Sequence, residues 1–226
     1  MAVFLDHTGR AENMEDRQEA RIRELEAALA EKTALLHEVD HRVKNNLQLI
    51  SSLMLLQSRR ITDETARQAL KTMLERVSAV ATVHRRLFQS DDAQHFNVTD
   101  FVRDLAGDLA LAAGRDDVKI ALDLQPVTIA ASAAAPFALV LNELIGNALK
   151  HAFAEGQSGT IGISIAQVDD ICILTVSDDG CGMGEAPKAF GLTIVHLLCR
   201  QLRAGLEFGV EGPGVRAVVR APLGAA

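Results

Sequence analysis

The chain has 226 residues, 48% of them hydrophobic and 23% charged, so it can bury a sizeable core and is not globally disordered. Its formal net charge of −7 and its lack of Trp and Tyr exclude a protein that mainly binds nucleic-acid phosphates or stacks bases on aromatic rings. The three cysteines match no disulfide framework and no apolar run reaches the roughly 20 residues of a membrane span, so we expect a cytoplasmic chain with no nucleic-acid or membrane partner.

The first third of the chain is expected to form two long helices. Positions spaced alternately three and four apart are mostly apolar from Ile22 to Leu53, which is the heptad pattern of a coiled-coil or bundle helix over about residues 18–58. The RRITD stretch at 59–63 interrupts this pattern and supplies a helix cap. A second apolar stripe runs from Leu70 to Leu87, so we predict an antiparallel helical hairpin followed by a polar linker.

After the linker the pattern changes to alternating helices and strands. The helices expected there cover about 98–113, 132–153, with Ser132 as its cap, and 192–202. The strands expected there cover 118–124, 127–130, 160–166, 171–177, 205–210 and 215–221. The fold class predicted from the pattern is therefore α+β, with the hairpin preceding a mixed domain.

The first candidate site is HEVDHRVKNNLQ, residues 37–48. His37 and His41 have the H-E-x-x-H spacing that binds zinc on one helix face, but the heptad register turns both toward solvent and no third ligand motif follows. An exposed neutral imidazole on a rigid helix also suits a nucleophile that accepts a transferable group. Two solvated histidines without a function are the third interpretation.

The second candidate site is LNELIGNALKHAF, residues 141–153. Glu143, Asn147 and His151 are spaced four apart and share one helix face, with Lys150 beside them. Burying such groups is costly without a ligand, and an amide oxygen is a group that Mg²⁺ binds. By itself the pattern also fits an ordinary polar stripe on a surface helix.

Two glycine-containing segments follow. In SDDGCGMG, residues 177–184, Asp178 ends an apolar strand and can accept a hydrogen bond from an amine such as that of adenine, while Gly180 and Gly182 let the backbone approach a flat ligand. The dinucleotide fingerprint is not met, because position 185 is Glu. In FGLTIV, residues 190–195, Gly191 opens a helix whose free N–H groups favour phosphate. Either segment alone is equally an ordinary turn.

Taken in order, these motifs resemble those of sensor histidine kinases of two-component signalling. HRVKNNLQ resembles the phosphoacceptor box H-R-x-K-N-N-L-Q of one subfamily, LNELIGNALKHAF its N box, DDGCG its D-x-G-x-G box and FGLTIV its second glycine box. The resemblance implies a dimerisation and phosphoacceptor hairpin at 18–90, a four-helix bundle in a homodimer, and an ATP-binding α/β-sandwich of the Bergerat (GHKL) type at 95–226. Residues 1–17 either resemble the junction after a PAS or LOV sensor of a longer parent protein or are a frayed terminus.

The resemblance carries roles over residue by residue. It implies that His41 accepts the γ-phosphate of ATP, that Asn147 binds Mg²⁺ and that Asp178 reads adenine. The phosphoryl group then passes to an aspartate of a response-regulator receiver domain. The residues implied to border the triphosphate or to let the backbone approach the nucleotide are Glu143, Lys150, His151, Gly180, Gly182, Gly191 and Leu192.

The chain departs from the common family form beside the phosphoacceptor. Arg42 stands where a Glu usually follows the histidine, so Asp40 or Glu38 would have to take or orient the proton of His41. Asn45, one turn on, is where related kinases keep a polar residue that can orient a water to dephosphorylate a partner. The short spacing between the two glycine boxes, 183–190, predicts a short lid over ATP.

Two alternative functions remain open at this point. A phosphotransfer scaffold would keep the hairpin but have an ATP domain that no longer binds nucleotide. A serine kinase or ATPase on the same fold would need neither His41 nor the hairpin.

Overall fold

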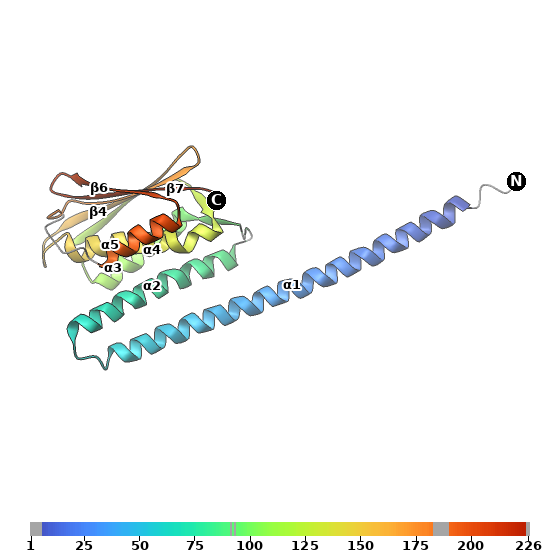
Figure 1. The fold of residues 1–226 in the computed structure, drawn as a ribbon, viewed down its shortest axis with the longest axis horizontal. Coiled ribbons are helices and arrows are strands. Elements are labelled where there is room, and N and C mark those ends of the chain that lie inside the picture. The colour runs from blue at the N-terminus through green and yellow to red at the C-terminus, as the bar shows by residue number, and fades with distance from the viewer. Residues whose placement is uncertain (1–5, 91, 93, 183–189, 225–226) are drawn as a thin grey trace. The chain divides into compact units, whose positions relative to one another are not determined.

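A computed structural model describes residues 6–90, 92, 94–182 and 190–224 of the chain (Figure 1). It divides into two units, Met1–Gln48 and Leu49–Ala226, and each is described by itself. The described part of the first unit is a single helix, α1 (Asp6–Ser58), which continues into the second unit. It begins earlier than the expected residue 18, because residues 6–17 are helical as well. Residues 1–5 of the expected sensor junction lie outside the described residues.

Helix α1 carries its apolar heptad residues on the surface. Leu29 and Leu36, both on the predicted seam, are 67% and 60% exposed. Other seam residues are exposed to a similar degree: Ile22, Leu25, Val39, Ile50 and Leu53. A stripe of this kind stabilises a helix only when a partner covers it.

Helix α2 (Glu64–Gln89) begins where the RRITD stretch predicted a cap. The side chain of Asp63 accepts a hydrogen bond from the backbone N–H of Ala66 at 2.7 Å, which satisfies one of the free donors of the first turn. Ala79 and Val83 are buried on the side of α2 that packs on the C-terminal domain. Neither belongs to the predicted apolar stripe, whose residues are partly buried or, at Met73, 49% exposed, so the helix is confirmed but the stripe is not its most buried face.

The C-terminal domain is built on a five-stranded mixed sheet with the strand order β2-β4-β5-β7-β6. Its strands are β2 (Val118–Leu124), β4 (Gly159–Val168), β5 (Ile171–Asp178), β6 (Gly205–Glu211) and β7 (Gly214–Pro222). Strands β2 and β4 are parallel, and the other neighbours are antiparallel. A two-stranded sheet pairs β1 (His95–Asn97) with β3 (Thr128–Ala130). The sequence did not predict β1, because three residues show no period.

Helices α3 (Val98–Ala113), α4 (Ala131–His151) and α5 (Phe190–Gln201) lie on one face of this sheet (Figure 1). Alternate residues of β4 and β5 face these helices and are buried, among them Ile163 and Leu174, while Phe137 and Leu141 of α4 are fully buried. Among the described helices only α4 is long and apolar enough to span a membrane, and 67% of its apolar window is buried, as is typical of a core helix. The predicted α+β architecture is confirmed.

The prediction that Ser132 caps α4 is wrong. The residue at the cap position is Ala130, whose side chain makes no capping bond. The backbone N–H groups of Ala130 and Ala131 instead donate to the carbonyls of Leu223 and Gln94, both at 2.8 Å. Segments distant in sequence therefore accept the hydrogen bonds of the first backbone N–H groups of α4. A local sequence pattern cannot predict such tertiary contacts.

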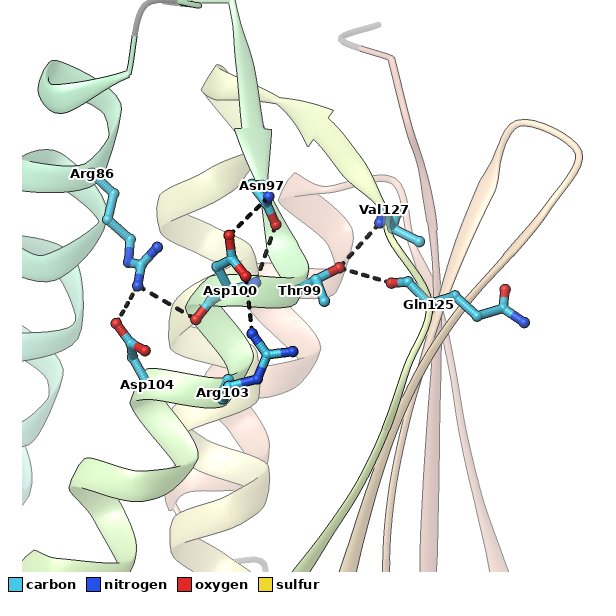
Figure 2. A network of polar contacts seen from close by, with 8 residues as sticks. All are labelled: Arg86, Asn97, Thr99, Asp100, Arg103, Asp104, Gln125 and Val127. Atoms are coloured by element: carbon cyan, nitrogen blue, oxygen red, sulfur yellow. Dashed lines mark hydrogen bonds and ion pairs between the residues drawn. The ribbon is translucent and has the colours of Figure 1, made fainter.

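Polar contacts tie the end of α2 to the C-terminal domain (Figure 2). The guanidinium of Arg86 pairs with Asp104 of α3 and donates to the carbonyl of Asp100 at 3.4 Å. Asn97 caps α3, because its Oδ1 accepts from the N–H of Asp100 at 3.1 Å. Thr99 joins α3 to the segment before β3, since its hydroxyl donates to the carbonyl of Gln125 at 2.7 Å. The contacts of Arg86 therefore join α2 to α3.

All three cysteines are free thiols. Cys172 and Cys199 are buried, and burial raises the pKa of Cys172 to about 12 and that of Cys199 to about 11. Cys181, in the predicted D-x-G-x-G box, is exposed.

Candidate functional site

A cleft of about 570 Å³ lies between α2 and α4, within the range of small-molecule sites. It brings together five of the residues singled out in the sequence: Glu143, Asn147, Lys150, His151 and Gly191. Its other wall is the first half of α2, which includes Thr72, Glu75 and Arg76. The polar residues of the N box therefore lie on one face of α4, as their spacing predicted, and this face is opposite α2.

Glu143 is a buried carboxylate with a complete partner. Its side chain is 5% exposed, and its two oxygens accept from Nε and a terminal nitrogen of Arg76 at 2.7 and 2.8 Å. The bond to Glu143 raises the pKa of Arg76, whose side chain is 17% exposed. This is a bidentate charge-assisted pair, among the strongest side-chain contacts in proteins.

Lys150 is also held by α2. Its ammonium group donates to the carboxylate of Glu75 at 2.9 Å and to the hydroxyl of Thr72 at 3.4 Å. Glu75 and Arg76 are consecutive, so one turn of α2 neutralises both charged residues that the N box presents to the cleft. Neither α2 residue was predicted from the sequence.

Two amide side chains in the cleft have unused hydrogen-bonding capacity. Asn147 is half-buried and its amide makes no hydrogen bond to the described residues. Asn142 is 3% exposed, and its Oδ1 has no partner among the same residues. Buried polar atoms of this kind normally bind something, so a ligand with donors or a hard cation fits here. The sequence signal for Asn142, a polar residue on an apolar helix, was overlooked.

Gly191 leaves room at the start of α5. A Cβ on this residue would lie 2.9 Å from Oε2 of Glu143 and 3.5 Å from Oδ1 of Asn147. The missing side chain therefore keeps the first turn of α5 directly beside the polar face of α4. Leu192 follows it and is half-buried. Lys150, the amide groups of Asn142 and Asn147 and the first turn of α5 are together suited to bind a phosphorylated ligand with a divalent cation.

Asp178 and its glycines form a tight turn next to the end of α4, outside the lining of the cleft. Oδ1 of Asp178 accepts from the N–H groups of Gly180 at 3.1 Å and Val215 at 3.3 Å, whereas Oδ2 accepts no hydrogen bond from the described residues. Gly180 allows no side chain, because a Cβ there would lie 2.1 Å from the carbonyl oxygen of Ala152. Gly182 has a φ of 77°, which favours glycine. The predicted lid falls mainly on 183–189, outside the described residues.

His41 is exposed on α1 in the first unit and contacts Asn45. The side-chain amide nitrogen of Asn45 lies 3.2 Å from Nδ1 of His41. Glu38 is bonded to Arg42 at 2.8 Å instead, and this bond lowers the pKa of Glu38. Asp40 is half-buried. The structure therefore places Asn45, predicted to orient a water for dephosphorylation, beside the ring, and that role and the role of either carboxylate stay predictions.

Among the described residues, the fold brings no third zinc ligand to His37 and His41. Within the described part of the chain, no three His, Cys, Asp or Glu side chains gather closely enough to hold a metal ion. Both histidines are exposed, as the heptad register predicted.

Comparison with known proteins finds two families along the chain. The family described as "Histidine kinase" matches residues 38–113, and the family described as "Histidine kinase-, DNA gyrase B-, and HSP90-like ATPase" matches residues 133–225.

Individual relatives agree with these matches. Sensor histidine kinase PdtaS of Mycolicibacterium smegmatis is 32% identical over 222 residues, which cover 92% of this chain and 43% of that protein. Blue-light-activated histidine kinase 2 of Erythrobacter litoralis is 29% identical over 201 residues, covering 83% of this chain and 57% of that protein. The solved histidine kinase domain of an Erythrobacter litoralis blue-light activated histidine kinase superposes with a TM-score of 0.63 at 25% identity, covering 83% of this chain and 90% of that one. The chain thus spans about half the length of the curated relatives it matches.

Proposed function

Because the chain belongs to the histidine kinase family and carries its gyrase B- and HSP90-like ATPase domain, we propose that it transfers the γ-phosphate of ATP to His41 and then to an aspartate of a response-regulator receiver domain. The observation that carries the proposal is the cleft, in which the free amide of Asn147 and the charged Lys150 adjoin Gly191. An intact polar site of this kind argues against a scaffold with an inactive ATP domain. An exposed His41 with a polar partner argues against a serine kinase or a plain ATPase.

In the proposed reaction the residues of the C-terminal domain bind and orient ATP. Oδ2 of Asp178 would accept a hydrogen bond from the amine of adenine, and the amide oxygen of Asn147 would bind Mg²⁺. When bound, Mg²⁺ neutralises negative charge on the β- and γ-phosphates. Gly191 and Leu192 would present the first turn of α5 to the phosphates, with Lys150 and His151 at the edge of the cleft. Most of the catalysis then lies in positioning and charge stabilisation.

His41 supplies the nucleophile of the proposed reaction. A lone pair on a ring nitrogen forms the N–P bond while the bond from the γ-phosphorus to the bridging oxygen breaks, and ADP leaves. After a 180° rotation of the Asn45 amide, its oxygen can accept a hydrogen bond from the Nδ1–H of His41, which leaves the lone pair on Nε2. Glu38, whose pKa Arg42 lowers, is a weaker base than an unpaired carboxylate, and Asp40 is the other carboxylate proposed to assist.

We extend the proposal to the assembly of the whole protein. The exposed apolar seam of α1 would be covered by a second copy in a homodimer, as a four-helix bundle with α2. An upstream PAS- or LOV-type sensor is proposed because one relative is named for activation by blue light. A cytoplasmic location is proposed because the three thiols are free.

Labelling with [γ-³²P]ATP tests the proposed function. We expect Mg²⁺-dependent label that is lost in acid and kept in base, as phosphohistidine is, and that moves to one member of a panel of purified receiver domains. Absence of both ATP binding and label would favour the scaffold. Acid-stable label would favour the serine kinase, and release of inorganic phosphate alone would favour the ATPase.

Asn147→Ala is expected to reduce the rate of labelling by about 100-fold or more at saturating ATP, because one oxygen ligand of Mg²⁺ is lost at the site of charge development. The Mg²⁺ concentration needed for half-maximal labelling should rise as well. Asn147→Asp keeps an oxygen ligand and serves as the matched control, with a smaller loss. A normal rate and a normal Mg²⁺ requirement in Asn147→Ala would remove the metal role from this residue.

A further inference from the structure

We propose that Arg76 of α2 is a positioning residue that holds the carboxylate of Glu143 and so prevents it from activating water against bound ATP. The inference rests on the proposed function, because it assumes that ATP binds in the cleft. It assigns to α2 a control over the fate of the γ-phosphate, which is transfer to His41 or loss to water.

The first step concerns the place of Glu143. Its Oε2 would lie 2.9 Å from a Cβ on Gly191, and this residue is in the first turn of the helix proposed to face the phosphates. Asn147, the proposed Mg²⁺ ligand, is one helical turn further along α4. A carboxylate beside a triphosphate and a divalent cation is a suitable general base for water. The cleft therefore contains the parts of an ATP hydrolase.

The second step concerns what keeps this carboxylate from acting as a base. Both oxygens of Glu143 already accept hydrogen bonds from the guanidinium of Arg76, which fixes the plane of the carboxylate. To take a proton from water, an oxygen of Glu143 would have to give up its hydrogen bond to Arg76, in a pair whose side chains are 5% and 17% exposed. With Arg76 in place, proton transfer from water to Glu143 is therefore disfavoured.

The third step concerns why a kinase needs this arrangement. The nucleophile His41 belongs to the first unit, whereas the cleft belongs to the second. ATP bound in the cleft has to survive until His41 reaches it. Without Arg76, water would attack the γ-phosphorus, the bond to the bridging oxygen of ADP would break, and Glu143 would take the proton of the water and release it to solvent. The products are ADP and inorganic phosphate.

The test uses the full chain with His41→Gln, so that phosphate release reports hydrolysis alone. Adding Arg76→Gln is expected to raise hydrolysis at saturating ATP at least about 100-fold, the lower end of what a general base contributes. Binding of a non-hydrolysable ATP analogue, followed by calorimetry, should weaken several-fold, because the charge of Glu143 is no longer neutralised. A damaged fold lowers affinity and turnover together, so opposite changes identify the positioning role.

A third substitution identifies the base. Adding Glu143→Gln to Arg76→Gln should return hydrolysis to its starting rate and restore affinity for the analogue. Arg76→Lys, which keeps the charge but loses the bidentate contact, should give an intermediate rate of hydrolysis. If urea titration shows that Arg76→Gln is unfolded, Arg76→Lys replaces it in the test. Arg85→Gln, which removes an exposed contact with Thr82 in the second half of the same helix, is the matched control and should change neither quantity.

Two outcomes overturn the inference. One is unchanged hydrolysis in an Arg76 variant that still binds the analogue. The other is an increase that persists when Glu143→Gln is added. Failure of the proposed function is a separate result, because the unsubstituted chain would then bind no ATP analogue or give no acid-labile label.

Discussion

Replacing His41 with glutamine is expected to abolish labelling from [γ-³²P]ATP, with a fall of at least about 10³-fold, in line with the loss of other enzymic nucleophiles. Glutamine has a similar length and polarity but no nucleophilic nitrogen. His41 is exposed on α1, so the substitution leaves no cavity and should not alter the free energy of unfolding. Phosphate incorporation is measured on gels, and binding of a non-hydrolysable ATP analogue is measured in parallel.

His37→Gln is the matched control for this prediction. It lies one turn earlier on the same helix, is also exposed, and should keep the label and the affinity for the analogue. The pair also tests the zinc interpretation, because a metal held by both histidines would be lost equally in the two variants. Label that persists after His41→Gln would assign the phosphoacceptor to another residue.

Local signals predicted most of the fold. The bounds of α3 and β2 agree with the expected 98–113 and 118–124, because Asn97 caps α3 and Gly114 ends it with a φ of 61°. The start of α4 was not predictable in this way, since its first N–H groups are satisfied by Gln94 and Leu223, which are distant in sequence. Where the free backbone groups at a helix terminus bond to residues distant in sequence, the local sequence pattern cannot predict where the helix begins.

In the candidate site, too, local spacing predicts some features and tertiary contacts determine the others. The fourfold spacing of Glu143, Asn147 and His151 places them on one face whatever surrounds the helix. The partner of Glu143 is 67 positions away, on a helix whose register over α4 depends on packing. A buried carboxylate predicts a cation, but nothing local selects Arg76 among 23 lysines and arginines.

Gly180→Ala is expected to lower the free energy of unfolding by at least about 2 kcal/mol, the middle of the range for overpacked sites. A Cβ would lie 2.1 Å from the carbonyl oxygen of Ala152 and 2.7 Å from its carbonyl carbon, and these backbone atoms cannot turn aside as a flexible side chain does. The same carbonyl accepts the N–H of Cys181 at 2.9 Å, so the turn and the end of α4 must separate. Urea titration measures the loss.

The substitution should also affect nucleotide binding, because Oδ1 of Asp178 accepts a hydrogen bond from the N–H of Gly180 in the same turn. We therefore expect Gly180→Ala to weaken binding of the ATP analogue as well as the fold. Gly146→Ala is the matched control: it also lies by the cleft, but its Cβ meets nothing within 4 Å, and alanine in a helix interior is favoured over glycine by up to about 1 kcal/mol. If both variants unfold at the same urea concentration, the close approach of Gly180 to Ala152 does not prevent a side chain at position 180.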